Sequence, residues 1–103
     1  MQSNKNKNLI VDLTFEFALK IIKYEELLER NRKYVIARQL LRSGTSIGAN
    51  VREAQNAESK ADFIHKFKIA AKESDETEYW LLLVKDLMGM IIVMNYYSIA
   101  LQL

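Results

Sequence analysis

Three residues of this chain stand in the order of a hydrolase catalytic triad. Ser46 lies within Gly44-Thr-Ser-Ile-Gly48, which matches the G-x-S-x-G nucleophile elbow, and Asp62 and His65 follow it. The elbow works because a sharp turn from a strand into a helix strains the serine and exposes its hydroxyl group. Here the motif lies within a helical pattern of apolar residues, and a chain of 103 residues cannot hold that fold. We therefore predict that this chain is not an enzyme.

Four carboxylates that could ligate a metal ion crowd one short segment, at Glu73, Asp75, Glu76 and Glu78. A di-iron site on facing helices needs Glu-x-x-His pairs. The single histidine, His65, belongs to no such pair, and the chain has no cysteine to supply a thiolate ligand. We predict no metal site and no cofactor, and we expect these carboxylates to pair with basic residues of the same copy or of another.

Basic residues are concentrated in the middle of the sequence. No acidic residue interrupts the window between residues 30 and 52, and Arg38, Arg42 and Arg52 fall on one helical stripe. A row of guanidinium groups can bind successive phosphates through bidentate hydrogen bonds. For any single arginine, the alternative is a solvated face or a salt bridge to Glu53 or to an acid on a neighbouring helix. We predict that the basic residues of this window contact nucleic acid as a set: Arg30, Arg32, Lys33, Arg38, Arg42 and Arg52.

The formal net charge of +2 conceals an uneven distribution. Residues 1–72 hold 14 Lys and Arg against 8 Asp and Glu, whereas residues 73–103 hold 1 against 5. Such an asymmetry can steer an anionic partner toward the basic part of the chain. It can equally bring opposite ends of two copies together, and the sequence leaves both interpretations open.

Two long helices have to position the basic residues. The first is predicted over residues 9–30 because apolar residues recur three and four apart, and Asn31 is expected to end it in a left-handed conformation. The second is predicted over residues 34–57. Within it, Gly44 and Gly48 each cost about 1 kcal/mol relative to alanine, so we expect either a kink or close packing against another helix.

A third helix is predicted to begin near Ser59-Lys-Ala-Asp62, which resembles a capping box with Asp in place of Glu, and to continue to about Val84. Residues 87–103 contain no charged residue. They are fewer than the roughly 20 apolar residues of a membrane span, so we predict a short fourth helix or an extended tail, with Gly89 as a candidate turn. A helix that is apolar on all sides needs partners on all sides, which indicates an oligomer.

These elements define the predicted organisation. We predict an all-α fold, an antiparallel up-down four-helix bundle whose fourth helix is short or atypical. Residues 1–8 are expected to form a flexible N-terminal tail, and residues 9–103 a single domain. The start of the chain lacks the apolar stretch of a signal peptide, so we expect a cytoplasmic protein.

Three segments, in order along the chain, resemble one bacterial protein family. They are residues 42–53 (Arg-Ser-Gly-Thr-Ser-Ile-Gly-Ala-Asn-Val-Arg-Glu), 59–63 (Ser-Lys-Ala-Asp-Phe) and 73–81 (Glu-Ser-Asp-Glu-Thr-Glu-Tyr-Trp-Leu). Over residues 9–86, the chain is similar to the four-helix-bundle proteins encoded in intervening sequences of 23S ribosomal RNA genes. A relative of that family is the accessory variability protein of diversity-generating retroelements.

The resemblance implies a non-enzymatic four-helix protomer that assembles into a ring-shaped homopentamer. The retroelement relative binds nucleic acid and a reverse transcriptase through a basic surface. Asn50 and Glu53 match polar positions typical of the family, and we expect them to form buried or inter-helix hydrogen bonds. Many relatives carry proline at the position of Gly48, and they follow the third helix with a polar turn and a charged fourth helix, unlike residues 87–103.

We therefore expect a non-enzymatic, oligomeric, RNA-associated accessory protein that binds phosphates through a basic helix face. The alternative is a structural oligomerisation scaffold whose partner is another protein. A membrane is not among the expected partners.

Overall fold

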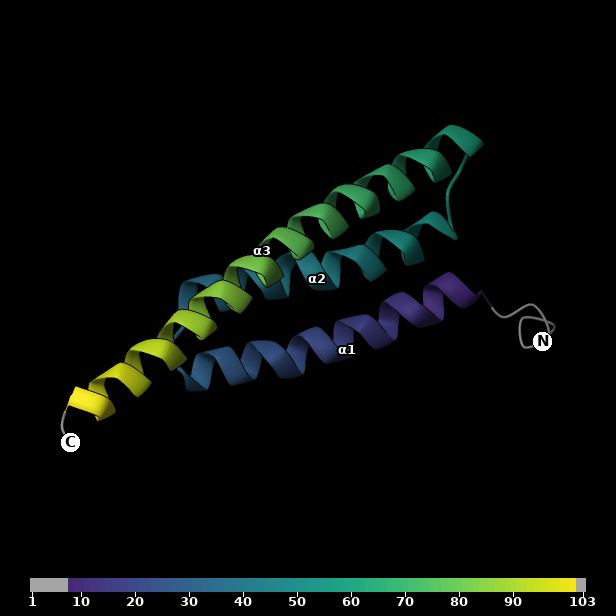
Figure 1. Cartoon of the computed structure of the whole chain (residues 1–103). Coiled ribbons are helices and arrows are strands. Elements are labelled where there is room, and N and C mark those ends of the chain that lie inside the picture. Colours follow the sequence, from purple (N-terminus) through teal and green to yellow (C-terminus); the bar gives the residue numbers. More distant parts are fainter. Residues whose placement is uncertain (1–7, 102–103) are drawn as a thin grey trace.

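The structure, a computed structural model, describes the backbone of residues 8–101 and the side chains of residues 8–90. Within this range the chain forms three helices and no strand: α1 (Leu9–Arg30), α2 (Tyr34–Ala54) and α3 (Lys60–Leu101) (Figure 1). The all-α prediction is confirmed. The predicted flexible tail, residues 1–8, lies outside the described residues except for Asn8.

α1 begins and ends where the sequence predicts. Asn8 caps its first turn, because the side-chain oxygen accepts the Ile10 N–H at 3.2 Å. The prediction of a left-handed Asn31 is wrong: Asn31 has φ −94°, and the left-handed residue is Arg32, with φ 62°. The Asn31 side chain donates to the Leu27 carbonyl at 2.9 Å, which holds it at the helix end and moves the reversal to the next residue.

α2 ends at Ala54, three residues before the predicted Ala57. The N–H groups of residues 55–57 donate to carbonyls three residues back, which tightens the last turn and ends the helix. The predicted capping motif does begin α3, since the Asp62 N–H donates to the Ser59 hydroxyl at 3.0 Å. In return, the Asp62 carboxylate accepts a hydrogen bond from the N–H of Glu58, in the preceding loop, at 3.3 Å.

α2 lies between the other two helices. Within the described part of the chain, no Cα atom of α1 comes within 8 Å of one in α3, so only α2 approaches both of the other backbones closely. Its glycines face α1: a Cβ on Gly44 would lie 2.8 Å from the Ile21 side chain, and one on Gly48 would lie 3.1 Å from the Thr14 carbonyl oxygen. Close packing, and not a break, is therefore the reason for the glycine pair, and α2 runs through both residues as one helix.

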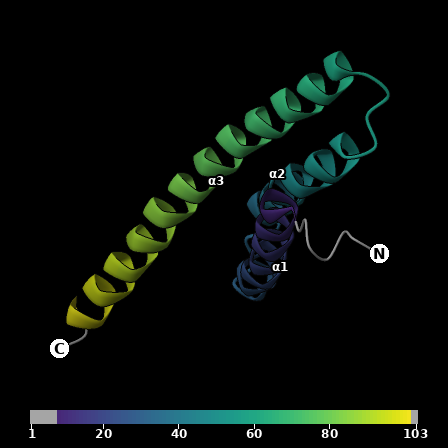
Figure 2. The same ribbon diagram turned by 90° about the vertical axis from the view of Figure 1, so that its right-hand side faces the viewer.

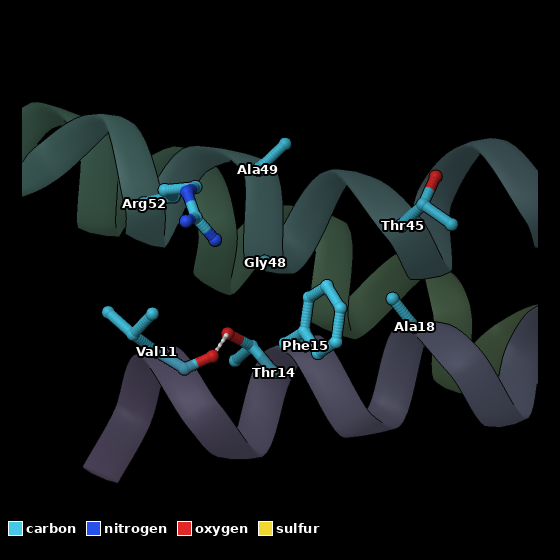
Figure 3. Close-up of a pocket in the computed structure, with 8 residues that line it drawn as sticks. All are labelled: Val11, Thr14, Phe15, Ala18, Thr45, Gly48, Ala49 and Arg52. Carbon is cyan, nitrogen blue, oxygen red and sulfur yellow. Dashed lines mark hydrogen bonds between the residues drawn. The ribbon is translucent and has the colours of Figure 1, made fainter. Parts of the chain in front are cut away.

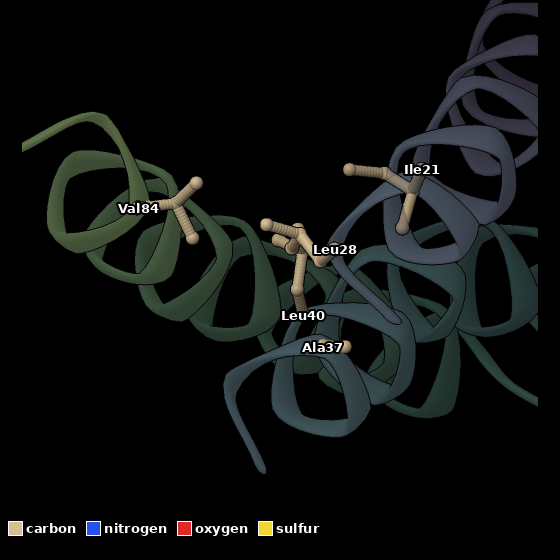
Figure 4. Close-up of a cluster of buried hydrophobic side chains, with 5 residues drawn as sticks. All are labelled: Ile21, Leu28, Ala37, Leu40 and Val84. Carbon is tan, nitrogen blue, oxygen red and sulfur yellow. The ribbon is translucent and has the colours of Figure 1, made fainter. Parts of the chain in front are cut away.

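A small core joins the three helices at the end where α1 turns into α2. Leu28 and Leu40 meet there, with Val84 reaching them from α3; the buried cluster is completed by Ile21 and Ala37 (Figure 4). Further along α2, the buried hydroxyls of Ser43 and Thr77 form a hydrogen bond at 2.9 Å, which fixes α3 against α2.

The separate fourth helix is not found among the described residues. α3 instead continues without interruption for 42 residues, about 63 Å at 1.5 Å per residue, and the molecule is 65 Å long but only 26 Å by 17 Å across. The prediction of a turn at Gly89 is wrong, because one glycine costs only about 1 kcal/mol in a helix and no proline or turn sequence accompanies it. Figures 1 and 2 show the C-terminal end of α3 extending past α1 and α2.

None of the three helices, over the residues described, combines the length and the apolar character that a membrane crossing requires.

Candidate nucleic-acid interface

The six predicted basic residues occupy two adjoining places. Arg30, Arg32 and Lys33 lie at the connection between α1 and α2. The other three lie on α2, where residues 38, 42 and 52 fall within about 80° of one another at 100° per residue. All six are exposed except Lys33, which is half-buried.

Arg42 differs from the other five because α3 neutralises it. Its guanidinium group donates to Glu73 at 3.2 Å and to Glu76, and the Trp80 indole N–H donates to the same Glu76 oxygen at 2.9 Å. The expected pairing of the acidic segment with the basic half is thus confirmed for Glu73 and Glu76. A phosphate would have to displace two carboxylates to reach Arg42.

The remaining five form no ion pair with any residue that the structure describes. We refer to this set as the basic surface: Arg30, Arg32, Lys33, Arg38 and Arg52. From the α1–α2 connection it continues along the outer face of α2. Eighteen residues separate Tyr34 from Arg52, which corresponds to about 27 Å of helix, or several nucleotides of an extended strand.

Aromatic residues accompany the basic surface at the α1–α2 connection. A hollow of about 440 Å³ is lined there by Arg32, Lys33, Tyr34 and Trp80, together with three residues of the first turns of α2. The Tyr34 side chain is 49% exposed. A base can therefore reach one face of this ring while its phosphate lies against the neighbouring cations.

Arg52 lies at the other end, beside a second hollow between α1 and α2. Its guanidinium group points from α2 toward α1, and Phe15 and Ala49 line the same hollow of about 230 Å³ (Figure 3). Gly48 also lines this hollow, at the point where the backbones of α1 and α2 come close, since a Cβ there would lie 3.1 Å from the Thr14 carbonyl oxygen. Arg52 is thus anchored beside apolar surface while its charge stays available to solvent.

The two predicted structural polar residues behave differently. Asn50 donates to the Ser46 carbonyl at 2.8 Å, within its own helix, and it forms no inter-helix hydrogen bond with the residues that the structure describes. Glu53 does bind across helices, accepting from the Lys66 ammonium at 2.9 Å. This hydrogen bond and the charge of Glu53 raise the pKa of Lys66.

The triad order seen in the sequence has no counterpart in space. The Ser46 hydroxyl donates to the Arg42 carbonyl at 2.5 Å inside α2, Asp62 is engaged at the start of α3, and His65 is exposed. No hydrogen bond links the three. Among the described residues, no group of three His, Asp or Glu side chains could hold a metal ion.

One buried charge escaped the sequence analysis. Glu25 lies on the α2-facing side of α1 and is only 6% exposed. A hydrogen bond with Glu29, then burial, and then the charges of Glu29 and Glu26 raise its pKa. Its spacing gives the signal that could have found it, because position 25 is four residues after Ile21 and three before Leu28, on the same stripe.

Comparisons with known proteins agree with this fold. A family model described as 23S rRNA-intervening sequence protein matches residues 6–99. Among solved structures, the chain resembles a crystal structure of a protein with unknown function from the S23 ribosomal protein family of Bacteroides thetaiotaomicron. The two are 52% identical with a TM-score of 0.72, over 74% of this chain and 71% of that one. No protein of curated function matches the chain.

Proposed function

Since the chain belongs to the family of 23S rRNA-intervening sequence proteins, we propose that it is a non-enzymatic, RNA-associated accessory protein of the bacterial cytoplasm. The basic surface would hold the phosphates of the RNA. The observation that carries this proposal is the set of five cations, Arg30, Arg32, Lys33, Arg38 and Arg52, that no carboxylate of the described chain neutralises. The expected relation to the retroelement accessory variability protein, which uses a basic surface in this way, supports the same proposal.

Tyr34 adds a second kind of contact. It stands beside Lys33 in the hollow of the α1–α2 connection, so a single-stranded RNA could stack one base there and run its phosphates along α2. Duplex RNA offers no such base, and its recognition would rest on phosphates and ribose hydroxyls alone. We therefore propose single-stranded RNA as the preferred form.

A salt titration tests the phosphate contacts. With a fluorescein-labelled single-stranded RNA, log Kd should rise with log salt concentration with a slope of up to about 3.5, because each of five contacts contributes about 0.7. The Arg38→Gln/Arg52→Gln double variant should lower the slope by about 1.4. Lys68→Gln/Lys72→Gln, which removes the same charge from exposed positions on α3, should leave it nearly unchanged.

Arg42→Gln separates the two kinds of arginine on α2. Because Arg42 is paired with Glu73 and Glu76, this variant should keep the slope of the unchanged protein. For the base contact, Tyr34→Ala should weaken binding by about 1–3 kcal/mol, whereas Tyr79→Ala, similarly exposed at 56% against 49% but on α3, should have little effect. Absence of RNA binding at low ionic strength would exclude the proposal.

The second candidate is an oligomerisation scaffold for a protein partner, and exposed apolar residues favour it. Phe15, Leu19 and Ile22 form a row on α1 and are 56%, 46% and 39% exposed. Under this alternative, glutamate at these positions would abolish partner binding, and RNA would not bind at all. Under either candidate we propose that the chain associates with itself, as the homopentamer implied by the family resemblance would require.

A further inference from the structure

We propose that the basic surface has a second base-binding site at its far end, in the hollow between α1 and α2 beside Arg52. We refer to it as the Phe15 hollow. A base of the RNA stacks there on the Phe15 ring, and the adjoining phosphate binds the Arg52 guanidinium group. This inference rests on the proposed function and narrows it to single-stranded RNA long enough to reach both Tyr34 and Phe15.

The Phe15 hollow has the size and the surface that one base requires. It encloses about 230 Å³, and a cavity of about 150 Å³ is enough for a benzene ring. The Phe15 side chain is 56% exposed and points from α1 into the space between the two helices (Figure 3). Val11, Ala18 and Ala49 provide apolar walls. A flat ring that enters the hollow therefore meets an aromatic face and apolar side chains.

The charge of the Phe15 hollow favours a nucleotide over an apolar side chain of a protein. Among the described residues that line it, Arg52 is the only charged one, and it has no ion-pair partner in the described chain. An apolar side chain would leave this cation without a counter-charge. A nucleotide brings a ring and a phosphate on one short linkage, so both features of the hollow are used.

The hydroxyl groups of the hollow indicate stacking and not recognition of a particular base. Thr14 donates to the Ile10 carbonyl at 2.8 Å, and Thr45 donates to the Leu41 carbonyl at 2.6 Å. Both hydroxyl protons are thus engaged within their own helices. Since every base has a face that can stack, we expect little dependence on RNA sequence.

The two base-binding sites lie on the same side of α2. At 100° per residue, Tyr34, Arg38 and Arg52 fall within about 40° of one another, so Arg38 lies on the path between the two rings. Ala49, in the wall of the Phe15 hollow, is about 22 Å along α2 from Tyr34. A strand stacked as in a duplex advances about 3.4 Å per nucleotide, so no more than about seven nucleotides are needed to connect the sites. A trinucleotide, even when extended, is too short.

Binding of RNAs of two lengths tests the proposal. A decamer can occupy both sites, and the second contact then forms within one complex at high effective concentration. Phe15→Ala should therefore weaken decamer binding about 10-fold, which lies within the range for loss of one stacked base. It should change trinucleotide binding less than about threefold, because one base can still use Tyr34. The salt slope should stay the same, since no charge is removed.

Two matched variants separate stacking from a general effect on α1. Leu19→Ala shortens an apolar side chain of similar exposure, 46% against 56%, that does not line the Phe15 hollow, and it should leave decamer binding unchanged. Phe15→Tyr preserves an aromatic ring and should retain the affinity of the unchanged protein. The melting temperatures of the three variants verify that each is folded.

Photochemical crosslinking locates the second base without any substitution in the protein. A decamer that carries 5-iodouridine near each end should crosslink to Phe15 as well as to Tyr34, and peptide mass spectrometry identifies the attached residues. Crosslinking at Phe15 should persist in Tyr34→Ala, because the two hollows are separate.

The outcomes distinguish a failure of this inference from a failure of the proposed function. If Phe15→Ala binds the decamer as the unchanged protein does, the Phe15 hollow serves a protein side chain instead and the inference is overturned, whereas RNA binding through Arg38 and Arg52 still stands. An equal loss in Leu19→Ala, or equal losses for the trinucleotide and the decamer, would also overturn it. If no RNA binds at low ionic strength, both fail.

Discussion

The two sides of α1 present the same kind of sequence and opposite kinds of structure. On the side of α2, Ile21 and Leu28 are buried and the glycines of α2 let the two backbones come close. On the side of α3, Leu13 is 54% exposed and Phe17 only half-buried, and both line a hollow of about 470 Å³ between α1 and α3. An apolar stripe therefore indicates that a helix face needs a partner, but it does not indicate whether the same chain supplies that partner.

Cavity formation should distinguish the two sides most strongly. Leu28→Ala removes a side chain that is 1% exposed and should lower the free energy of unfolding by about 3 kcal/mol. Leu13→Ala, measured at a concentration where the chain is monomeric, should cost less than about 1 kcal/mol. Urea unfolding followed by Trp80 fluorescence measures both, and equal losses would contradict the difference between the sides.

Filling the close crossing should have the next largest effect. Gly44→Val places a branched side chain where even a Cβ would lie 2.8 Å from Ile21, and overpacking of this kind costs about 2 kcal/mol. Gly89→Val makes the same change in α3, where a Cβ would meet no atom within 4 Å, and should change stability by less than about 0.5 kcal/mol. Both variants exchange glycine for valine inside a helix, so their change in helix propensity is the same and the difference between them reports the contact with α1.

Loss of the buried hydroxyl pair should cost somewhat less. Thr77→Val preserves shape but leaves the Ser43 hydroxyl, which is fully buried, without its 2.9 Å partner. We expect a loss of about 1–2 kcal/mol in thermal unfolding. The Ser43→Ala/Thr77→Val double variant should recover part of it because neither hydroxyl is then left unpaired; a double variant worse than the sum would argue against the pair.

The smallest effect on the free energy of unfolding concerns Glu25, on the α2-facing side of α1, and it depends on pH. Because the pKa of Glu25 is raised in the folded state, its contribution to stability is greatest below its ordinary value of 4.5 and is lost as pH rises through the raised value. Glu25→Gln resembles the protonated form at every pH. It should therefore be more stable than the unchanged protein at pH 7 and equal to it near pH 4, and a pH-independent difference would exclude this origin.

The sequence predicts the helices well because their signals are local. The apolar rhythm of α1 and the capping residues Ser59 and Asp62 place helix starts correctly, and Gly44 with Gly48 indicates a close crossing. The continuity of α3 through Gly89 escapes prediction, since a lone glycine is compatible with both a turn and a helix. In the candidate site, composition identifies the basic surface, but only the structure shows that Arg42 forms ion pairs with Glu73 and Glu76.

The salt dependence of RNA binding tests most directly the proposal that the basic surface holds phosphates. Arg38→Gln/Arg52→Gln should lower the slope of log Kd against log salt concentration by about 1.4, because each phosphate contact contributes about 0.7. Arg42→Gln should leave the slope unchanged, because Glu73 and Glu76 already pair with Arg42. Equal slopes for the unchanged protein and both variants, or no RNA binding at low ionic strength, would contradict the account.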